Sequence, residues 1–283
     1  MKAIIICLLS LVLIYACTSV ESRTNGKSSE NAQLIKDSII PSKDYKIDPN
    51  LSPEQRQKVI SILDKKYLMG KFDPEKDSNY VPIPLQISLY SDRKMYMRKE
   101  ALEKYEQMYM AAAKEGIVLK ILSATRPFDI QKSIWERKWT GKQKSNGAFL
   151  PESLKGKDRA LKILEVSSMP GTSRHHWGTD IDINDVEFAY WSTPVGVKTY
   201  NWLVAHAHEH GFCQPYSKMG ADRPEGYMEE KWHWSYMPLA REFIEKYRNE
   251  IQDADINGFL GSETAAELKV VKVYVLGINP NCE

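Results

Sequence analysis

The spacing of apolar side chains predicts five helices in the later part of the chain. In residues 92–115 the apolar side chains recur on one helical face, and Gly116 can end the helix. Pro127 suits the first turn of a second helix, which runs to Trp139. The other segments with helical character are 155–168, 198–210 and 238–251.

Three shorter stretches have the pattern of strands: "IVLKILS" (117–123), "TDIDI" (179–183) and "KWHWSYM" (231–237). Successive side chains of a strand point to opposite faces. Asp180 and Asp182 therefore share one face of their strand, and Ile181 and Ile183 share the other. Helices and strands follow one another here without a regular strand–helix–strand alternation, which predicts an α+β fold.

The N-terminal pattern, "MKAIIICLLSLVLIYACTS", predicts export of the protein. One basic residue precedes an apolar run that is too short to cross a membrane and fits the core of a signal peptide. "LIYAC" resembles a bacterial lipobox, which would remove residues 1–16 and attach lipid to Cys17. The alternative is a plain secretory signal that is cut nearby. We expect a lipoprotein at a membrane, facing the periplasm or the cell wall.

Composition changes divide the rest of the chain. Residues 18–50 are polar and predict a flexible tether after the signal segment 1–17. Residues 51–79 form an N-terminal extension with a short helix, and 80–250 form the compact domain. The pattern of 251–283 is less clear, and we treat it as a C-terminal extension.

The net charge argues against a nucleic-acid partner, and the cysteine content predicts a disulfide. The net charge of +2 over 283 residues gives no basic footprint for nucleic acid, and we expect a monomer. Once Cys7 leaves with the signal and Cys17 carries lipid, Cys213 and Cys282 remain in an oxidising compartment. We predict a disulfide between them. Two separate buried thiols are the alternative, because a sequence gives no distance between two cysteines.

Two polar motifs contain residues that bind metal ions. In "SRHHWGTDIDIND", His175 and Asp182 lie seven residues apart, with Gly178 between them to let the chain turn. "EEKWHW" offers His233 as a third ligand and Glu230 as a general base. Catalytic zinc sites use three such ligands and leave the fourth position to water. Each motif alone is also compatible with a solvated loop or with core aromatic residues around one histidine.

Taken together, the motifs resemble those of the D-alanyl-D-alanine carboxypeptidases of the VanY type. "SRHHWGTDID" is similar to the family's Ser-x-His-x-x-Gly-x-x-x-Asp signature, and "EKWHW" to its Glu-x-Trp-His-Trp signature. "ILSATRPFDIQ" and "YNWLVAHAHEHGFCQPY" look like two further family segments. The resemblance covers roughly residues 80–247. It implies the hedgehog/D-Ala-D-Ala peptidase fold, with zinc on a central antiparallel sheet.

The resemblance also implies roles for individual residues. His175, Asp182 and His233 become the ligands of one zinc ion per chain, and Glu230 becomes the general base. Arg126 would hold the carboxylate of the substrate or polarise its scissile carbonyl, since the guanidinium has a fixed fork of donors. A surface salt bridge is the alternative for Arg126.

Two more residues are expected to contribute to substrate binding. Ser173 would bind substrate or brace its loop. Asp180 departs from the family pattern, which usually has a small residue two positions before the ligand aspartate. Its carboxylate would hydrogen-bond a ligand histidine or bind a substrate amine.

The function that the resemblance implies is removal of the terminal D-Ala from peptidoglycan stem peptides by a water that zinc activates. The alternatives are a peptidoglycan endopeptidase or D,D-dipeptidase with the same site, and a zinc-binding module without catalysis. The presence of Glu230 beside a full set of ligands favours a metallopeptidase.

Overall fold

The computed structural model describes residues 64–282. The expected signal segment 1–17 with its lipidated Cys17, the tether 18–50 and residues 51–63 of the N-terminal extension lie outside the described residues. Within them, no helix is both long and apolar enough to cross a bilayer.

A four-stranded antiparallel sheet forms the centre of the structure, with strand order β3-β4-β6-β5. These strands are β3 (Ile121–Ser123), β4 (Asp180–Ile183), β5 (Phe212–Cys213) and β6 (His233–Tyr236). In the register between β4 and β6, Asp180 lies opposite Ser235 and Asp182 lies opposite His233. A second, two-stranded antiparallel sheet pairs β1 (Tyr80–Pro82) with β2 (Tyr96–Arg98).

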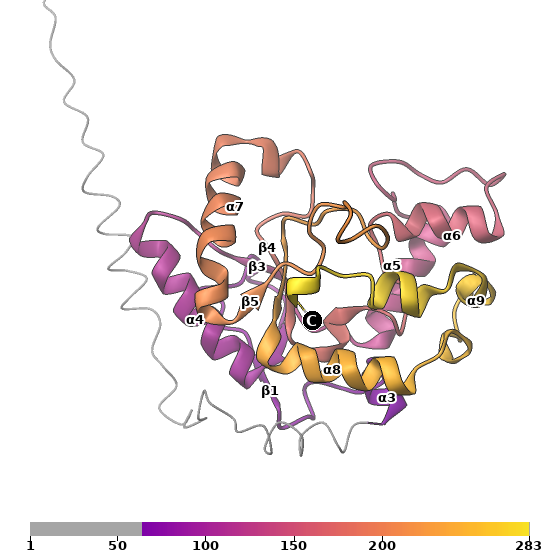
Figure 1. Cartoon of the computed structure of the whole chain (residues 1–283), viewed down its shortest axis with the longest axis horizontal. Coiled ribbons are helices and arrows are strands. Elements are labelled where there is room, and N and C mark those ends of the chain that lie inside the picture. The colour runs from indigo at the N-terminus through magenta and orange to yellow at the C-terminus, as the bar shows by residue number, and fades with distance from the viewer. Residues whose placement is uncertain (1–63, 283) are drawn as a thin grey trace, which may run out of the picture.

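Helices pack around the central sheet, so the expected α+β class is confirmed. They are α3 (Lys65–Leu68), α4 (Lys99–Lys114), α5 (Phe128–Trp139), α6 (Gly156–Leu164), α7 (Pro194–His206), α8 (Met237–Glu250) and α9 (Ala265–Leu268). Figure 1 shows α4 and α7 on one side of the sheet, and α5, α6, α8 and α9 on the other.

Three predicted elements are shorter than their sequence patterns indicated. The helix expected from residue 92 begins at Lys99, because Tyr96–Arg98 pairs with β1 instead. The strand expected over 117–123 is confined to Ile121–Ser123, and the helix expected over 155–168 ends at Leu164.

The side of the sheet that faces α4 and α7 is a hydrophobic core. Ile181 and Ile183 of β4 and Trp234 and Tyr236 of β6 are buried in it. Because side chains alternate along a strand, this packing directs the intervening polar residues of β4 and β6 to the opposite face.

The C-terminal segment after α8 packs onto the same body and does not form a core of its own. Its apolar side chains share one hydrophobic cluster with those of α5, α6 and α8. The indole N–H of Trp135 on α5 donates to the carbonyl of Leu260 over 2.8 Å. A disulfide joins Cys282 to Cys213 of β5, with their Cα atoms 5.7 Å apart.

Candidate metal centre

The polar face of β4 and β6 carries Asp180, Asp182, His233 and Ser235, and all four are buried. The antiparallel register places Asp182 directly opposite His233. Two of the three expected metal ligands therefore come from strand alternation and strand pairing alone.

His175 reaches this face from a single 3₁₀ turn, Arg174–Trp177, that precedes β4. The turn ends at Gly178, whose φ of +72° favours glycine. A Cβ atom at this position would lie 2.3 Å from the ring of Tyr80, so a side chain would also clash. Gly178 therefore lets the chain reverse tightly enough to return His175 to the sheet.

The tautomer of His175 leaves one nitrogen available to a metal ion. Its Nδ1 lies 2.8 Å from the carbonyl oxygen of Ala124, which can only accept, so Nδ1 carries the proton. The other nitrogen, Nε2, is buried and has no hydrogen-bond partner among the described residues. A buried, unpartnered nitrogen with a lone pair is costly unless it binds something.

Two of the three distances between the candidate ligand atoms match the spacing of a tetrahedral zinc site. Oδ1 of Asp182 lies 3.3 Å from Nε2 of His175 and 3.4 Å from Nδ1 of His233. All three atoms lie within 4.8 Å of one another. Ligands on a tetrahedron with bonds of about 2.0–2.2 Å would lie about 3.3–3.6 Å apart. Two imidazoles and one carboxylate also match the ligand types that zinc takes.

The charges of this cluster are strongly coupled. Burial would raise the pKa of Asp182, but His175, Arg126 and His233 hold it well below its usual range. Burial lowers the pKa of His175, with a further contribution from the Arg126 charge. These shifts keep Asp182 ionised and His175 neutral, which are the states in which both bind metal ions.

A turn brings Glu230 to the same centre. The N–H of His233 lies 3.3 Å from the carbonyl oxygen of Glu230, which closes a tight turn before β6. Oε2 of Glu230 consequently lies 3.2 Å from Nδ1 of His233. In an extended chain the two residues would be about 10 Å apart. The turn therefore places the carboxylate beside the ligand cluster.

Asp180 lies behind His233. Its Oδ1 accepts hydrogen bonds from Nε2 of His233 over 3.0 Å and from Nε of Arg174 over 2.9 Å. Its Oδ2 accepts from the hydroxyl groups of Thr179 and Ser235, over 2.7 and 2.9 Å. The side chain is fully buried and is not part of the cavity wall. The expectation that Asp180 binds a substrate amine does not match this position, whereas the bond to a ligand histidine does.

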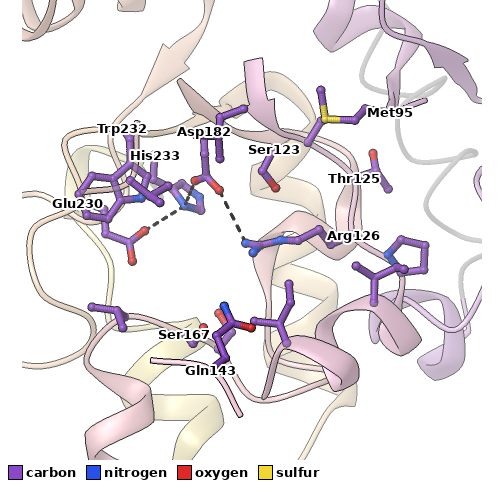
Figure 2. A pocket seen from close by; sticks show the side chains of 18 of the residues that line it. Met95, Ser123, Thr125, Arg126, Gln143, Ser167, Asp182, Glu230, Trp232 and His233 are labelled. Atoms are coloured by element: carbon purple, nitrogen blue, oxygen red, sulfur yellow. Dashed lines mark ion pairs between the residues drawn. The ribbon is translucent and has the colours of Figure 1, made fainter. Parts of the chain in front are cut away.

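A cavity of about 710 Å³ opens beside the candidate metal centre. Asp182, Glu230 and His233 form part of its wall. Figure 2 shows these side chains pointing toward one another, with Ser167 and Gln143 across the cavity. Two of the three candidate ligands and the candidate base therefore face a space that can admit a substrate.

Arg126 enters the cavity at the end of β3. Its Nη2 lies 3.9 Å from Oδ2 of Asp182, as Figure 2 shows. The Nε of Arg126 is buried and has no hydrogen-bond partner among residues 64–282. The backbone around it is held by His176, whose Nδ1 contacts the carbonyl of Arg126 and whose Nε2 accepts from the N–H of Gly171. Arg126 thus has unused donors near the ligand cluster, unlike a residue in a surface salt bridge.

Ser173 is buried at the start of the 3₁₀ turn and is not among the residues that line the cavity. Its carbonyl accepts from the N–H of His176, which holds the turn together. The hydroxyl of Ser173 is buried without a hydrogen-bond partner among residues 64–282, so only its backbone braces the turn, and its position does not favour contact with substrate.

Lys138, Ser167 and Tyr216 are among the polar residues of the cavity wall that sequence reasoning missed. A signal for Lys138 was present. Phe128, Gln131, Trp135 and Lys138 recur at helical spacing on the buried face of α5, so a charged residue occupies an inward position. Tyr216 packs its ring against His233, with centroids 4.8 Å apart. Its contribution depends on a loop whose path the sequence pattern does not predict.

Comparison with known proteins identifies the family to which the chain belongs. A model of the VanY family, described as D-alanyl-D-alanine carboxypeptidase, matches residues 94–239, more than half of the chain. The chain is 28% identical over 219 residues to "Putative carboxypeptidase YodJ" of Bacillus subtilis strain 168, covering 75% of this chain and 69% of that protein. It is 26% identical over 190 residues to a D-alanyl-D-alanine carboxypeptidase of Enterococcus faecalis, covering 66% and 60%.

Among solved structures, the chain is similar to the LD-carboxypeptidase LdcB. The TM-score is 0.46 and the sequence identity is 25%, and the match covers 65% of this chain and 81% of that one.

Proposed function

Because the chain belongs to the VanY family of D-alanyl-D-alanine carboxypeptidases, we propose that it is a zinc-dependent D,D-carboxypeptidase. In this proposal it removes the terminal D-Ala from peptidoglycan stem peptides with one zinc ion per chain. Its ligands are His175, Asp182 and His233.

One observation carries the proposal. Nε2 of His175 is buried without a hydrogen-bond partner in the described part of the chain, and it lies 3.3 Å from the carboxylate of Asp182. A third donor, Nδ1 of His233, completes the set within 4.8 Å. This arrangement is costly without a cation and favourable with one. Asp182 and His233 line a cavity whose wall also carries the carboxylate of Glu230, which is suited to proton transfer.

When bound, zinc lowers the pKa of a water molecule to near neutrality and polarises the substrate carbonyl. Residues of the chain transfer the protons, stabilise the developing charge and orient a ligand. Glu230 accepts the proton of the attacking water, and it later delivers a proton to the leaving amine of D-Ala. Arg126 directs its unused N–H donors at the oxygen on which negative charge develops. Asp180 fixes the ring of His233 through Nε2, so that Nδ1 faces the ion.

The same proposal includes the location of the enzyme. Peptidoglycan lies outside the cytoplasm, and the N-terminal pattern of the chain resembles a lipoprotein signal. We propose an exported enzyme that is anchored to a membrane through Cys17. Labelling cells with a radioactive fatty acid tests the anchor: label should appear in the wild-type protein and be absent from a Cys17→Ser variant.

The test of activity is digestion of purified muropeptides that end in D-Ala-D-Ala, followed by mass analysis. We expect release of D-Ala that stops when a chelator removes the metal and resumes when zinc is added. A Glu230→Gln variant should keep one zinc per chain and lose about 10²- to 10⁴-fold in turnover. The exposed Glu245 on α8 offers a matched control, since Glu245→Gln removes the same charge far from the cavity.

Other outcomes would redirect the proposal. Chelator-sensitive cleavage at an internal peptide bond would identify an endopeptidase with the same site. Zinc bound at one per chain without cleavage of any muropeptide would identify a zinc-binding module.

A further inference from the structure

Lys138 is a buried cation in the wall of the cavity. It lies near the C-terminal end of α5, on the helix face that also buries Trp135, and only 7% of its surface is exposed. Its Nζ donates to the hydroxyl of Ser167 over 2.8 Å. No carboxylate lies within ion-pair distance of it among residues 64–282. Lysine is almost never this buried unless its charge is paired.

The ammonium group has donors to spare. It carries three N–H bonds, and Ser167 uses one of them. Burial lowers the pKa of Lys138 to about 8, with a further contribution from the Arg126 charge, while Glu230 and Glu187 oppose the shift. Lys138 is therefore still a cation at neutral pH. It is also close enough to Arg126 and Glu230 for their charges to act on it.

The cavity thus contains two cations with different positions. Arg126 lies against the ligand cluster, 3.9 Å from Asp182. Lys138 lines the cavity beside Ser167, and Figure 2 shows Ser167 across the cavity from that cluster. A peptide whose last bond is cut presents two negative groups to such a site. One is the oxygen of the scissile carbonyl, and the other is the terminal carboxylate, about 3.8 Å further along the chain.

Resting on the carboxypeptidase function proposed above, we propose that Lys138 binds the C-terminal carboxylate of the substrate, which leaves Arg126 free to act on the scissile carbonyl. Lys138 then determines specificity for a chain end. A substrate that continues beyond the scissile bond would present a neutral amide to a buried ammonium group. The charge of Lys138 would stay unpaired, which disfavours binding of internal peptide segments.

Two peptides test this inference: a blocked L-lysyl-D-alanyl-D-alanine with a free carboxylate, and the same peptide with a C-terminal amide. The zinc-loaded wild-type enzyme should prefer the acid by at least about tenfold in kcat/KM, since a hydrogen bond to a charged group is lost in the amide. In Lys138→Met the KM for the acid should rise by a similar factor, while kcat/KM for the amide should not fall, because the variant also removes the unpaired charge that disfavours the amide. Lys138→Arg should restore part of the preference for the acid.

A binding measurement separates recognition from catalysis. Calorimetry on the zinc-loaded Glu230→Gln protein should show tighter binding of the acid than of the amide, and Lys138→Met in that background should abolish the difference. Lys132→Gln is the matched control, because Lys132 lies on the same helix but not in the cavity wall. Zinc content and melting temperature show whether each variant is folded.

The outcomes are distinct. If the wild type binds and cleaves acid and amide equally, the inference is wrong, whatever the variants do. An equal loss for both peptides in a folded Lys138→Met protein would also overturn it, since Lys138 would then act on structure or on the reacting centre. Absence of any zinc-dependent cleavage by the wild type would instead contradict the proposed function. Selective binding of the acid would then still support the role of Lys138.

Discussion

The carboxylate of Asp180 accepts a hydrogen bond from Nε2 of His233 over 3.0 Å, and neither side chain is more than 4% exposed. This bond turns the opposite nitrogen, Nδ1, toward Asp182 at 3.4 Å. Burial alone would lower the pKa of His233, but the bonds to Asp180 and Glu230 and the charge of Asp182 raise it to about 9. Asp180 therefore decides which nitrogen of His233 faces the candidate metal centre.

Removing the charge of Asp180 should weaken metal binding. We expect Asp180→Asn to lower zinc affinity about 10- to 100-fold, because partners behind a ligand histidine fix its ring and increase its basicity. Titration of the metal-free protein against a competing chelator measures the effect. Asp158→Asn, on the exposed start of α6, is the control and should leave affinity unchanged. Equal affinities for the wild type and Asp180→Asn would contradict the role given to Asp180.

Asp180 also neutralises Arg174, which is completely buried. Asp180→Ala should destabilise the metal-free protein by about 3–5 kcal/mol, since it leaves the charge of Arg174 unpaired. The double variant Asp180→Ala, Arg174→Met should recover much of this loss. Urea unfolding of the four proteins gives the coupling energy.

The exposed pair Lys157–Glu267, at 2.8 Å, is the reference for that double-mutant cycle. Its coupling energy should be below about 1 kcal/mol, because solvent screens the charges. A coupling between Arg174 and Asp180 as small as that of the exposed pair would show that the buried contact does not hold the 3₁₀ turn to β4.

Substrate binding should depend on pH through Lys138. Its pKa is lowered from 10.5 to about 8, so the ammonium group is charged below pH 8 and loses its proton above it. The KM for a peptide acid should therefore rise as the pH increases through about 8. Lys138→Arg should remove this rise, because arginine keeps its charge. A peptide amide should show no such dependence in either protein, and an identical rise for acid and amide would assign the titration to another group.

The disulfide between Cys213 and Cys282 closes a loop of 69 residues. Replacing both cysteines by serine should cost about 2–4 kcal/mol in the free energy of unfolding, mainly by releasing the unfolded chain. Chemical denaturation of the oxidised wild type and of the double variant measures the cost. Adding a reductant should lower the stability of the wild type toward that of the variant. A reductant that lowers the stability of both proteins equally would point to an effect unrelated to this bond.

The sequence alone determined the chemical nature of the site and its local geometry. The spacing of His175, Gly178 and Asp182 predicted a turn followed by a strand, and strand alternation put Asp180 and Asp182 on one face. These features depend on backbone dihedrals and on side-chain direction, which act over a few residues. The motif around His233 supplied the third ligand through resemblance, because no local rule connects segments that are fifty residues apart.

Only the tertiary structure decided what these residues contact. Pairing of β4 with β6 brought Asp180 to His233. Contacts with His233, Arg174 and Ser235 bury Asp180, which is not part of the cavity wall. The start of α4 moved to Lys99 because the residues before it joined a strand. Lys138 became part of the cavity wall because α5 packs that face against the loop of Ser167. Such contacts join residues distant in sequence, and burial and packing of the whole body select them over local preferences.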